Sequence, residues 1–244
     1  MSEGFSVADY GGFVLAWSDD WPGLVAGATA PSKLESAVPL ALAEHTAWLN
    51  AHGEDGPGGS GWHLTETISG AATTVAGGEF CFSADREPLP PQAFERAARH
   101  VRLAAKGLAA SAALPDALLD WMPPGLKLEH TDPWAPDPRT IRGILTHALQ
   151  LEVYYRDGLR DGTATGIFGA VRTPQEELDA TLAVLQLAAR DPGRSYAPVR
   201  PSRTEPDAWT LRKVIRRLIS HHRAHTAEIL QRRTWVLLGV PATD

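Results

Sequence analysis

The stretch from Trp209 to Arg233 decides the fold, and it reads WTLRKVIRRLISHHRAHTAEILQRR. Its apolar residues recur three and four positions apart, which is the spacing of one face of an α-helix. They are Leu211, Val214, Ile215, Leu218 and Ile219. His221 and His225 continue the stripe that runs through Val214 and Leu218. The pattern predicts a long amphipathic helix whose buried side leads into two histidines.

Three earlier segments show the same helical spacing. The first covers residues 91–112, and its face consists of Phe94, Ala97, Ala98, Val101, Ala104 and Ala105. A second helix is expected to open near Pro138 and to stop at Gly158, since proline suits a first turn and glycine a C-terminus. A third is expected to start at Thr173, which is followed by Pro174 and Glu176, and to end before Asp191. Four amphipathic helices with connections of moderate length predict a four-helix bundle.

The chain before these helices predicts mixed α and β structure. Short apolar or alternating runs typical of strands lie at Phe13–Trp17, Leu24–Ala26, Trp62–Val75 and Phe80–Ser83. Between them a helix is expected after a cap at Ser32, because Leu34, Val38, Leu42, His45 and Leu49 recur at helical spacing. The polar, proline-rich stretch Asp85–Gln92 then marks a boundary. The fold class is therefore predicted as α+β, with a small α/β domain over residues 1–84 and a four-helix bundle over residues 90–240.

The composition of the chain excludes several classes of function. With 244 residues and 43% apolar residues, the chain is long enough for a sizeable core. A net charge of −6 argues against a non-specific nucleic-acid partner, and a single cysteine excludes a disulfide framework. No apolar run approaches the length of a membrane span, and the first ten residues lack the pattern of a secretory signal. We therefore expect a cytoplasmic protein with neither a nucleic-acid nor a membrane partner.

Three of the nine histidines have the spacing of a metal site. His221 and His225 lie four residues apart, or about 40° around a helix, so both imidazoles can face one point. An ordinary polar helix face would show the same spacing. His147 lies at the edge of the apolar stripe of the second helix, and facing helices of a bundle bring inward polar side chains together. Three histidine ligands would leave at least one coordination position open, which is the catalytic pattern.

The sequence gives weaker evidence for a functional role of the other histidines. His45 is expected to be a satisfied core residue on its helix. His52, His63, His100 and His130 are expected to lie in or beside loops or on exposed turns. His222 lies near the apolar stripe and competes with His221 as a candidate ligand. Cys81, between Phe80 and Phe82, is expected to be a small buried hydrophobic residue.

Residues of about 90–240 resemble the DinB/YfiT-like superfamily of four-helix-bundle metalloproteins. The matching pieces are Ile144–His147 with Glu152 and Tyr155, then Trp209–Arg212, and then His221–Leu230. The resemblance implies His147, His221 and His225 as the metal triad, zinc or nickel as the metal, and frequent dimers. It also implies a thiol-dependent transferase or isomerase acting on a small molecule with a low-molecular-weight thiol. A non-catalytic metal-binding stress or interaction protein is the alternative.

The beginning of the chain is similar to a small HicB-like module, the antitoxin half of a toxin–antitoxin pair. The similar parts are Phe13–Trp17, the turn and run at Asp20–Gly27, and the end of the helix at Ala47–Leu49. The alternative is a small α/β domain that packs on the bundle.

Overall fold

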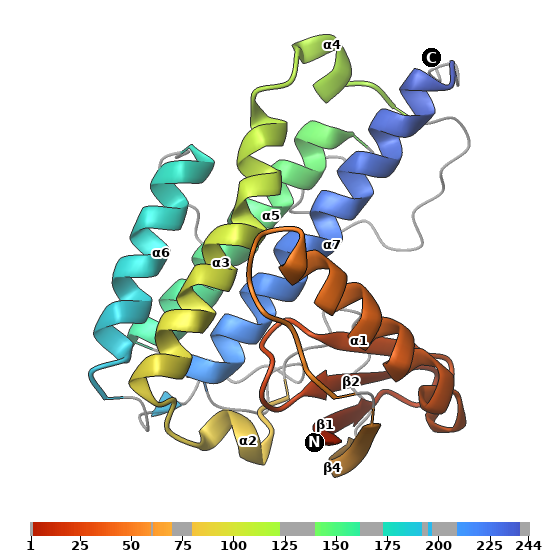
Figure 1. The fold of residues 1–244 in the computed structure, drawn as a ribbon. Coiled ribbons are helices and arrows are strands. Elements are labelled where there is room, and N and C mark those ends of the chain that lie inside the picture. The colour runs from red at the N-terminus through yellow and green to blue at the C-terminus, as the bar shows by residue number, and fades with distance from the viewer. Residues whose placement is uncertain are drawn as a thin grey trace.

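A computed structural model describes residues 2–59, 61–69, 80–122, 140–161, 173–191, 195–196 and 209–239. Within these residues the protein is α+β, as predicted (Figure 1). A four-stranded sheet with one helix lies beside a group of longer helices, and the longest of these, α7, runs from the sheet toward the C-terminus. None of the described helices combines the length and apolar character that a membrane span requires.

The sheet is formed by β1 to β4, which cover Ser2–Asp9, Val14–Ser18, Val25–Ala28 and Gly61–Ser69. Their order is β3-β2-β1-β4. The pairs β1–β2 and β2–β3 are antiparallel, whereas β4 pairs with β1 in parallel. A parallel pair needs a crossover, and α1 at Leu34–Asn50 provides it. Sequence analysis located β2, β3 and nearly all of β4, but it gave no strand at β1. Residues 70–75 of the predicted strand Trp62–Val75 lie outside the described part.

Helix α1 packs on one face of the sheet, and we call β1–β4 with α1 the α/β unit. The five residues predicted to face inward are all buried. Leu34, Val38 and Leu42 among them contact a layer of strand and loop residues: Phe5, Val7, Val14, Ala16, Leu24 and Ala26. The predicted cap at Ser32 is wrong, because a 3-10 turn at Pro31–Lys33 precedes the helix. The nearby Ser36 hydroxyl instead donates to the Lys33 carbonyl.

The predicted strand at Phe80–Ser83 is also wrong. Phe80 and Phe82 bury their rings against Ala8 and Trp17 on the other face of the sheet. The short helix α2, Ser83–Arg86, begins directly afterwards, and its Asp85 carboxylate accepts a hydrogen bond from the Phe82 backbone N–H at 3.0 Å. The apolar run is therefore buried as a helix entry, which periodicity in so short a run cannot distinguish from a strand.

Four long helices pack together, and we call them the four-helix cluster. They are α3 at Pro91–Ala112, α5 at Ile141–Asp161, α6 at Pro174–Ala188 and α7 at Leu211–Leu237. Helices α3 and α5 each contact both α6 and α7. The short helix α4, Asp116–Leu119, follows α3, and the two-residue strands β5 and β6 are Ser195–Tyr196 and Trp209–Thr210. Helix α6 starts after Thr173, as predicted, and Thr173 and Glu176 form a capping box there.

Helix α5 does not stop at Gly158, which corrects the sequence prediction. It starts at Ile141, whereas Pro138 lies outside the described residues, and it continues to Asp161. The indole of Trp209, fully buried, packs on Gly158, and a Cβ atom there would come within 2.6 Å of the ring. Gly158 therefore serves close packing between α5 and the start of α7 rather than helix termination.

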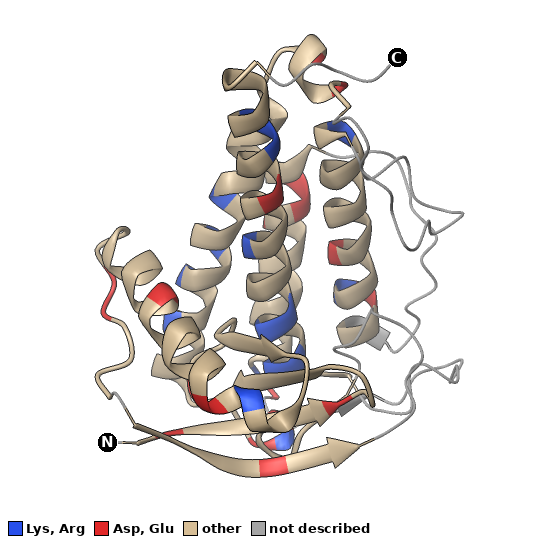
Figure 2. Ribbon diagram, turned by 90° about the vertical axis from the view of Figure 1, so that its right-hand side faces the viewer, with Lys and Arg blue, Asp and Glu red and all other residues tan. Residues whose placement is uncertain are grey.

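One face of α7 holds the α/β unit. Arg212, Arg216, Ile219 and Arg223 follow each other at helical spacing along this face. In Figure 2 several Lys and Arg positions lie on the helical part beside the sheet, and others lie farther along the helices. Arg212 donates to the carbonyl of Asp19, and Ile219 packs on Gly23, which has the positive φ of 87°. The helix that carries two candidate metal ligands is therefore also the docking helix of the α/β unit.

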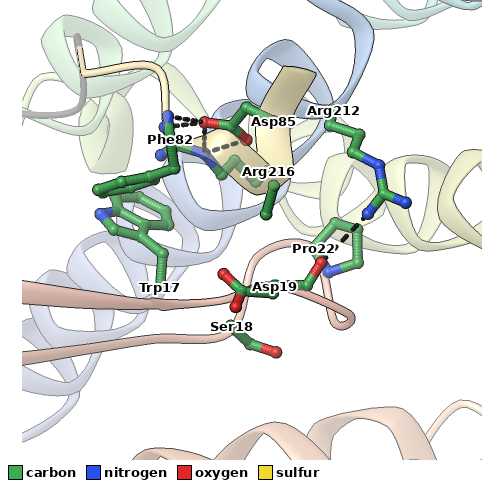
Figure 3. Close-up of a pocket in the computed structure, with 9 residues that line it drawn as sticks. Trp17, Ser18, Asp19, Pro22, Phe82, Asp85, Arg212 and Arg216 are labelled. Atoms are coloured by element: carbon green, nitrogen blue, oxygen red, sulfur yellow. Dashed lines mark hydrogen bonds and ion pairs between the residues drawn. The ribbon is translucent and has the colours of Figure 1, made fainter. Parts of the chain in front are cut away.

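Arg216 is the centre of this contact (Figure 3). Its guanidinium lies over the rings of Trp17 and Phe82, at 4.6 and 4.9 Å. It donates to both carboxylate oxygens of Asp85 and to the Phe80 carbonyl. The adjacent cavity has a volume of about 20 Å³, which is room for one water molecule and not for a substrate. The contact is therefore structural.

Candidate metal centre

The structure brings His147 on α5 together with His221 and His225 on α7. One ring nitrogen from each lies within 4.8 Å of the other two. The ring centroid of His147 is 5.4 Å from that of His221 and 5.1 Å from that of His225. All three side chains are partly buried. The three residues selected from sequence therefore converge on one point between two helices and could hold a metal ion.

The packing of α5 on α7 creates this convergence. His147 is flanked on α5 by Ile144 and Ala148, which are almost completely buried and fix the face that α5 turns inward. Tyr155 lies beside the site, with its ring nearly perpendicular to that of His221 at a centroid distance of 6.2 Å. The Tyr155 hydroxyl accepts a hydrogen bond of 2.8 Å from Arg217, which lies one turn before His221. This bond joins α5 to α7 next to the site.

The two histidines of α7 already have the geometry of neighbouring ligands. Their Nε2 atoms are 2.9 Å apart. A zinc ion with bonds of about 2.0–2.1 Å separates tetrahedral ligands by roughly 3.3 Å, so these two nitrogens need to move by only a few tenths of an ångström. His147 must approach further, because the three ligand atoms are spread over up to 4.8 Å. Rotation of the His147 side chain alone can move its ring nitrogen over this distance.

Glu228 orients one of the ligands. Its carboxylate accepts a hydrogen bond of 2.9 Å from Nδ1 of His225, one turn earlier on α7. Burial raises the pKa of Glu228, but the hydrogen bond and charge of His225 outweigh it and leave the pKa below its ordinary value. An ionised carboxylate on Nδ1–H leaves Nε2 as the free ligand atom, which is the arrangement common at histidine metal sites. Sequence analysis did not single out Glu228.

His221 is electrostatically prepared to bind a cation as a neutral ring. Burial, followed by the charges of His225 and Arg217, holds the pKa of His221 well below its ordinary value. A ring that stays unprotonated keeps its lone pair available, and only the neutral imidazole can coordinate a metal. The protein therefore favours the ligand form of this residue before any metal binds.

His222 points away from the triad into the four-helix cluster. It is completely buried, and its Nε2 lies 3.3 Å from a carboxylate oxygen of Glu152 on α5, which is 2% exposed. The sequence signal for this pair is the position of Glu152 on the buried stripe of Ala148 and Tyr155. The structure thus groups His222 with Glu152, whereas the cluster that could hold a metal consists of His147, His221 and His225.

The remaining histidines divide between core and surface. His45 is buried, as predicted, but it is not fully satisfied, because no described residue reaches its Nε2. His52 and His63 are exposed. The prediction for His100 is wrong: it is completely buried, because it lies on the face of α3 that α1 and the Trp21 ring cover. His130 lies outside the described residues. Cys81 is buried, as predicted, which raises the pKa of its thiol.

Fold and site define an α+β protein with a histidine triad between two helices of a four-helix cluster. No known protein family, no curated protein and no solved structure matches the chain. Its chemistry is therefore argued from the geometry of the site itself.

Proposed function

We propose that this protein binds one divalent transition metal ion at His147, His221 and His225 and acts on a small molecule there. In this proposal the four-helix cluster is a bundle of the DinB-like kind. The observation that carries it is the meeting of three ring nitrogens from α5 and α7 within 4.8 Å. A metal ion can accept the lone pair of one ring nitrogen from each of the three imidazoles at once.

The donor set favours a transition metal, and the resemblance to the DinB-like bundles favours zinc or nickel among these. Imidazole nitrogen is a borderline ligand that suits zinc, copper, iron and nickel, whereas magnesium and calcium prefer oxygen. Three protein ligands leave at least one coordination position for a substrate atom or water. When bound, the ion would supply Lewis acidity, polarising a substrate oxygen or lowering the pKa of a bound thiol. This is the chemistry of a thiol-dependent transferase or isomerase.

The chain's own residues have defined tasks in this proposal. Glu228 holds the proton on Nδ1 of His225 and so presents Nε2 to the ion. Arg217 and Tyr155 form a hydrogen-bonded polar wall beside His221. The Arg217 charge helps to keep His221 unprotonated. In the described part of the chain, residues of α5 and α7 therefore carry binding, orientation and protonation state.

Metal content tests the proposal directly. Protein purified without any nickel column is expected to contain about one divalent ion per chain, the stoichiometry of a single triad. The variants His147→Ala and His225→Ala are expected to lose the metal ion. The matched control His52→Ala, at an exposed position just after α1, is expected to retain it. A wild-type protein that neither contains nor binds zinc, nickel or cobalt would refute the metal site.

Turnover then separates the enzyme from its alternative. The metal-loaded protein is assayed with small thiols and electrophilic substrates, and His225→Ala serves as the inactive control. Activity that follows metal content supports the transferase or isomerase. A metal-loaded protein that turns over none of these substrates contradicts the catalytic half of the proposal and favours a non-catalytic metal-binding protein.

A further inference from the structure

A second histidine cluster lies far along the chain from His147, where α1, α3 and α7 meet. His45 of α1 and His100 of α3 both have fully buried side chains. The ring of Trp48 contacts both, with centroids 5.4 and 6.1 Å away. Trp21 stacks on the other side of His100 at 6.4 Å. The two imidazoles therefore fill the seam between the α/β unit and the four-helix cluster.

The seam is built for neutral imidazoles. Nδ1 of His45 accepts a hydrogen bond of 2.6 Å from Arg223 of α7, which requires an unprotonated nitrogen. Among the described residues no hydrogen-bond partner reaches Nε2 of His45 or either ring nitrogen of His100. A protonated imidazole has two N–H groups that need acceptors. Within hydrogen-bond distance the described residues supply no acceptor for these groups, and the Glu54 carboxylate lies farther off, 3.9 Å from Nε2 of His100.

The charges around the two rings also oppose protonation. Arg223 faces His45 from α7 and lies over the Trp48 ring at 4.5 Å, with Glu44 of α1 acting on Arg223. The charges on α3 that act on His100 are Arg96 and Arg99. Among the described residues the carboxylate that faces His100 is that of Glu54, which lies 3.9 Å from Nε2 and already accepts a hydrogen bond of 2.9 Å from Arg99. The exposed His52 also contacts the Trp48 ring.

We propose that this seam is an acid-sensitive latch, in which protonation of His45 and His100 releases the α/β unit from α3 and α7. In the closed state the rings of His45 and His100 are held neutral between aromatic side chains and arginines. In the open state both rings reach water and take up protons freely. The device goes beyond the proposed metal site and uses none of its residues, but it acts on α7, where Arg223 lies between His221 and His225.

The sign and size of the effect follow from proton linkage. Burial, then the charge of Arg223, lowers the pKa of His45 to about 3, and burial lowers that of His100 to about 4 against the opposing charge of Glu54. The open state binds more protons wherever the pH lies below about 6.5 and above these values, so acid favours opening. From pH 7.5 to 5.0 the opening constant rises about 30-fold per histidine and about 10³-fold for both.

Hydrogen exchange on the full chain tests the latch, with chelator present throughout so that metal release plays no part. At pH 5.0 the opening constant of α1 amides, corrected for intrinsic exchange, is expected to be about 10³-fold higher than at pH 7.5. Amides of α6, which is remote from the seam, are expected to change much less. The variant H45Q/H100Q is expected to lose the pH dependence, and the matched control H52Q/H63Q, with two exposed histidines of the same unit, to keep it.

Three results would overturn the proposal. The first is a rise of less than tenfold in wild-type α1 opening, and the second is an equal rise in α6, which would mean global unfolding. The third is an unchanged pH dependence in H45Q/H100Q. If the double variant does not fold, H45Q and H100Q are measured singly. In each, the rise of the opening constant from pH 7.5 to 5.0 should be about 30-fold smaller than in the wild type. In addition, NMR titration of the wild type should show neither ring protonating above pH 5 in the closed form.

Discussion

Removing the carboxylate of Asp85 is expected to destabilise the whole contact between the α/β unit and α7. Both partners of the Arg216–Asp85 pair are buried, with 5% and 6% of their side chains exposed. Asp85 accepts from Nε and Nη2 of Arg216 at 2.8–3.1 Å. After Asp85→Ala the guanidinium keeps only the Phe80 carbonyl at 2.6 Å and the two aromatic faces. Leaving such a charge unpaired costs about 3–5 kcal/mol.

Urea denaturation followed by tryptophan fluorescence measures this cost. With a slope of about 2–3 kcal/mol per molar, the loss corresponds to a fall of roughly 1–2 M in the midpoint. The double variant Asp85→Ala/Arg216→Met removes the orphaned charge and is expected to recover part of the loss, because an apolar replacement of both partners is often nearly neutral.

The exposed pair Arg142–Asp120 is a matched control. It has the same two-point geometry, with bonds of 2.6 and 3.0 Å, but its side chains are 48% and 57% exposed. Solvent screens it, so Asp120→Ala should shift the midpoint far less. If Asp85→Ala costs no more than Asp120→Ala, or if the double variant is as unstable as Asp85→Ala alone, the reasoning from burial is refuted.

Three further results are expected. Gly158→Ala should lower the thermal midpoint, because its Cβ would meet the Trp209 ring at 2.6 Å and overpacking of this kind costs about 1–3 kcal/mol; an unchanged melting curve would contradict the packing. His221→Leu should abolish metal binding measured by calorimetry, whereas His222→Leu should keep most of it, and equal losses would mean that the wrong histidine has been assigned. Lowering the pH from 7 to 5 should weaken metal binding, but by less than the roughly 1.5 × 10⁴-fold that three imidazoles of pKa about 6.5 would give, since His221 resists protonation; a full loss of that size would refute its depressed pKa.

Local patterns in the sequence determined the helices and the identity of the triad. The inward face of α1 and the span of α3 follow from apolar spacing, which is a property of the chain within one turn or two. The pair His221 and His225 follows from the same spacing, because four residues return a helix to nearly the same face. His147 was found because a polar residue on a buried stripe needs a partner on a neighbouring helix.

Only the tertiary structure decided which residues meet across the fold. Gly158 predicts a helix end until the Trp209 ring is placed on it, and Phe80–Phe82 predicts a strand until both rings pack under the sheet. His100 has no local signal for burial, since the residues that cover it come from α1 and from the turn at Trp21. The partners of Arg216 and Arg223 lie more than a hundred residues away in sequence. Periodicity reports the face of an element, whereas the neighbour that covers that face depends on long-range packing, and this is why the acid-sensitive seam could not be found from sequence.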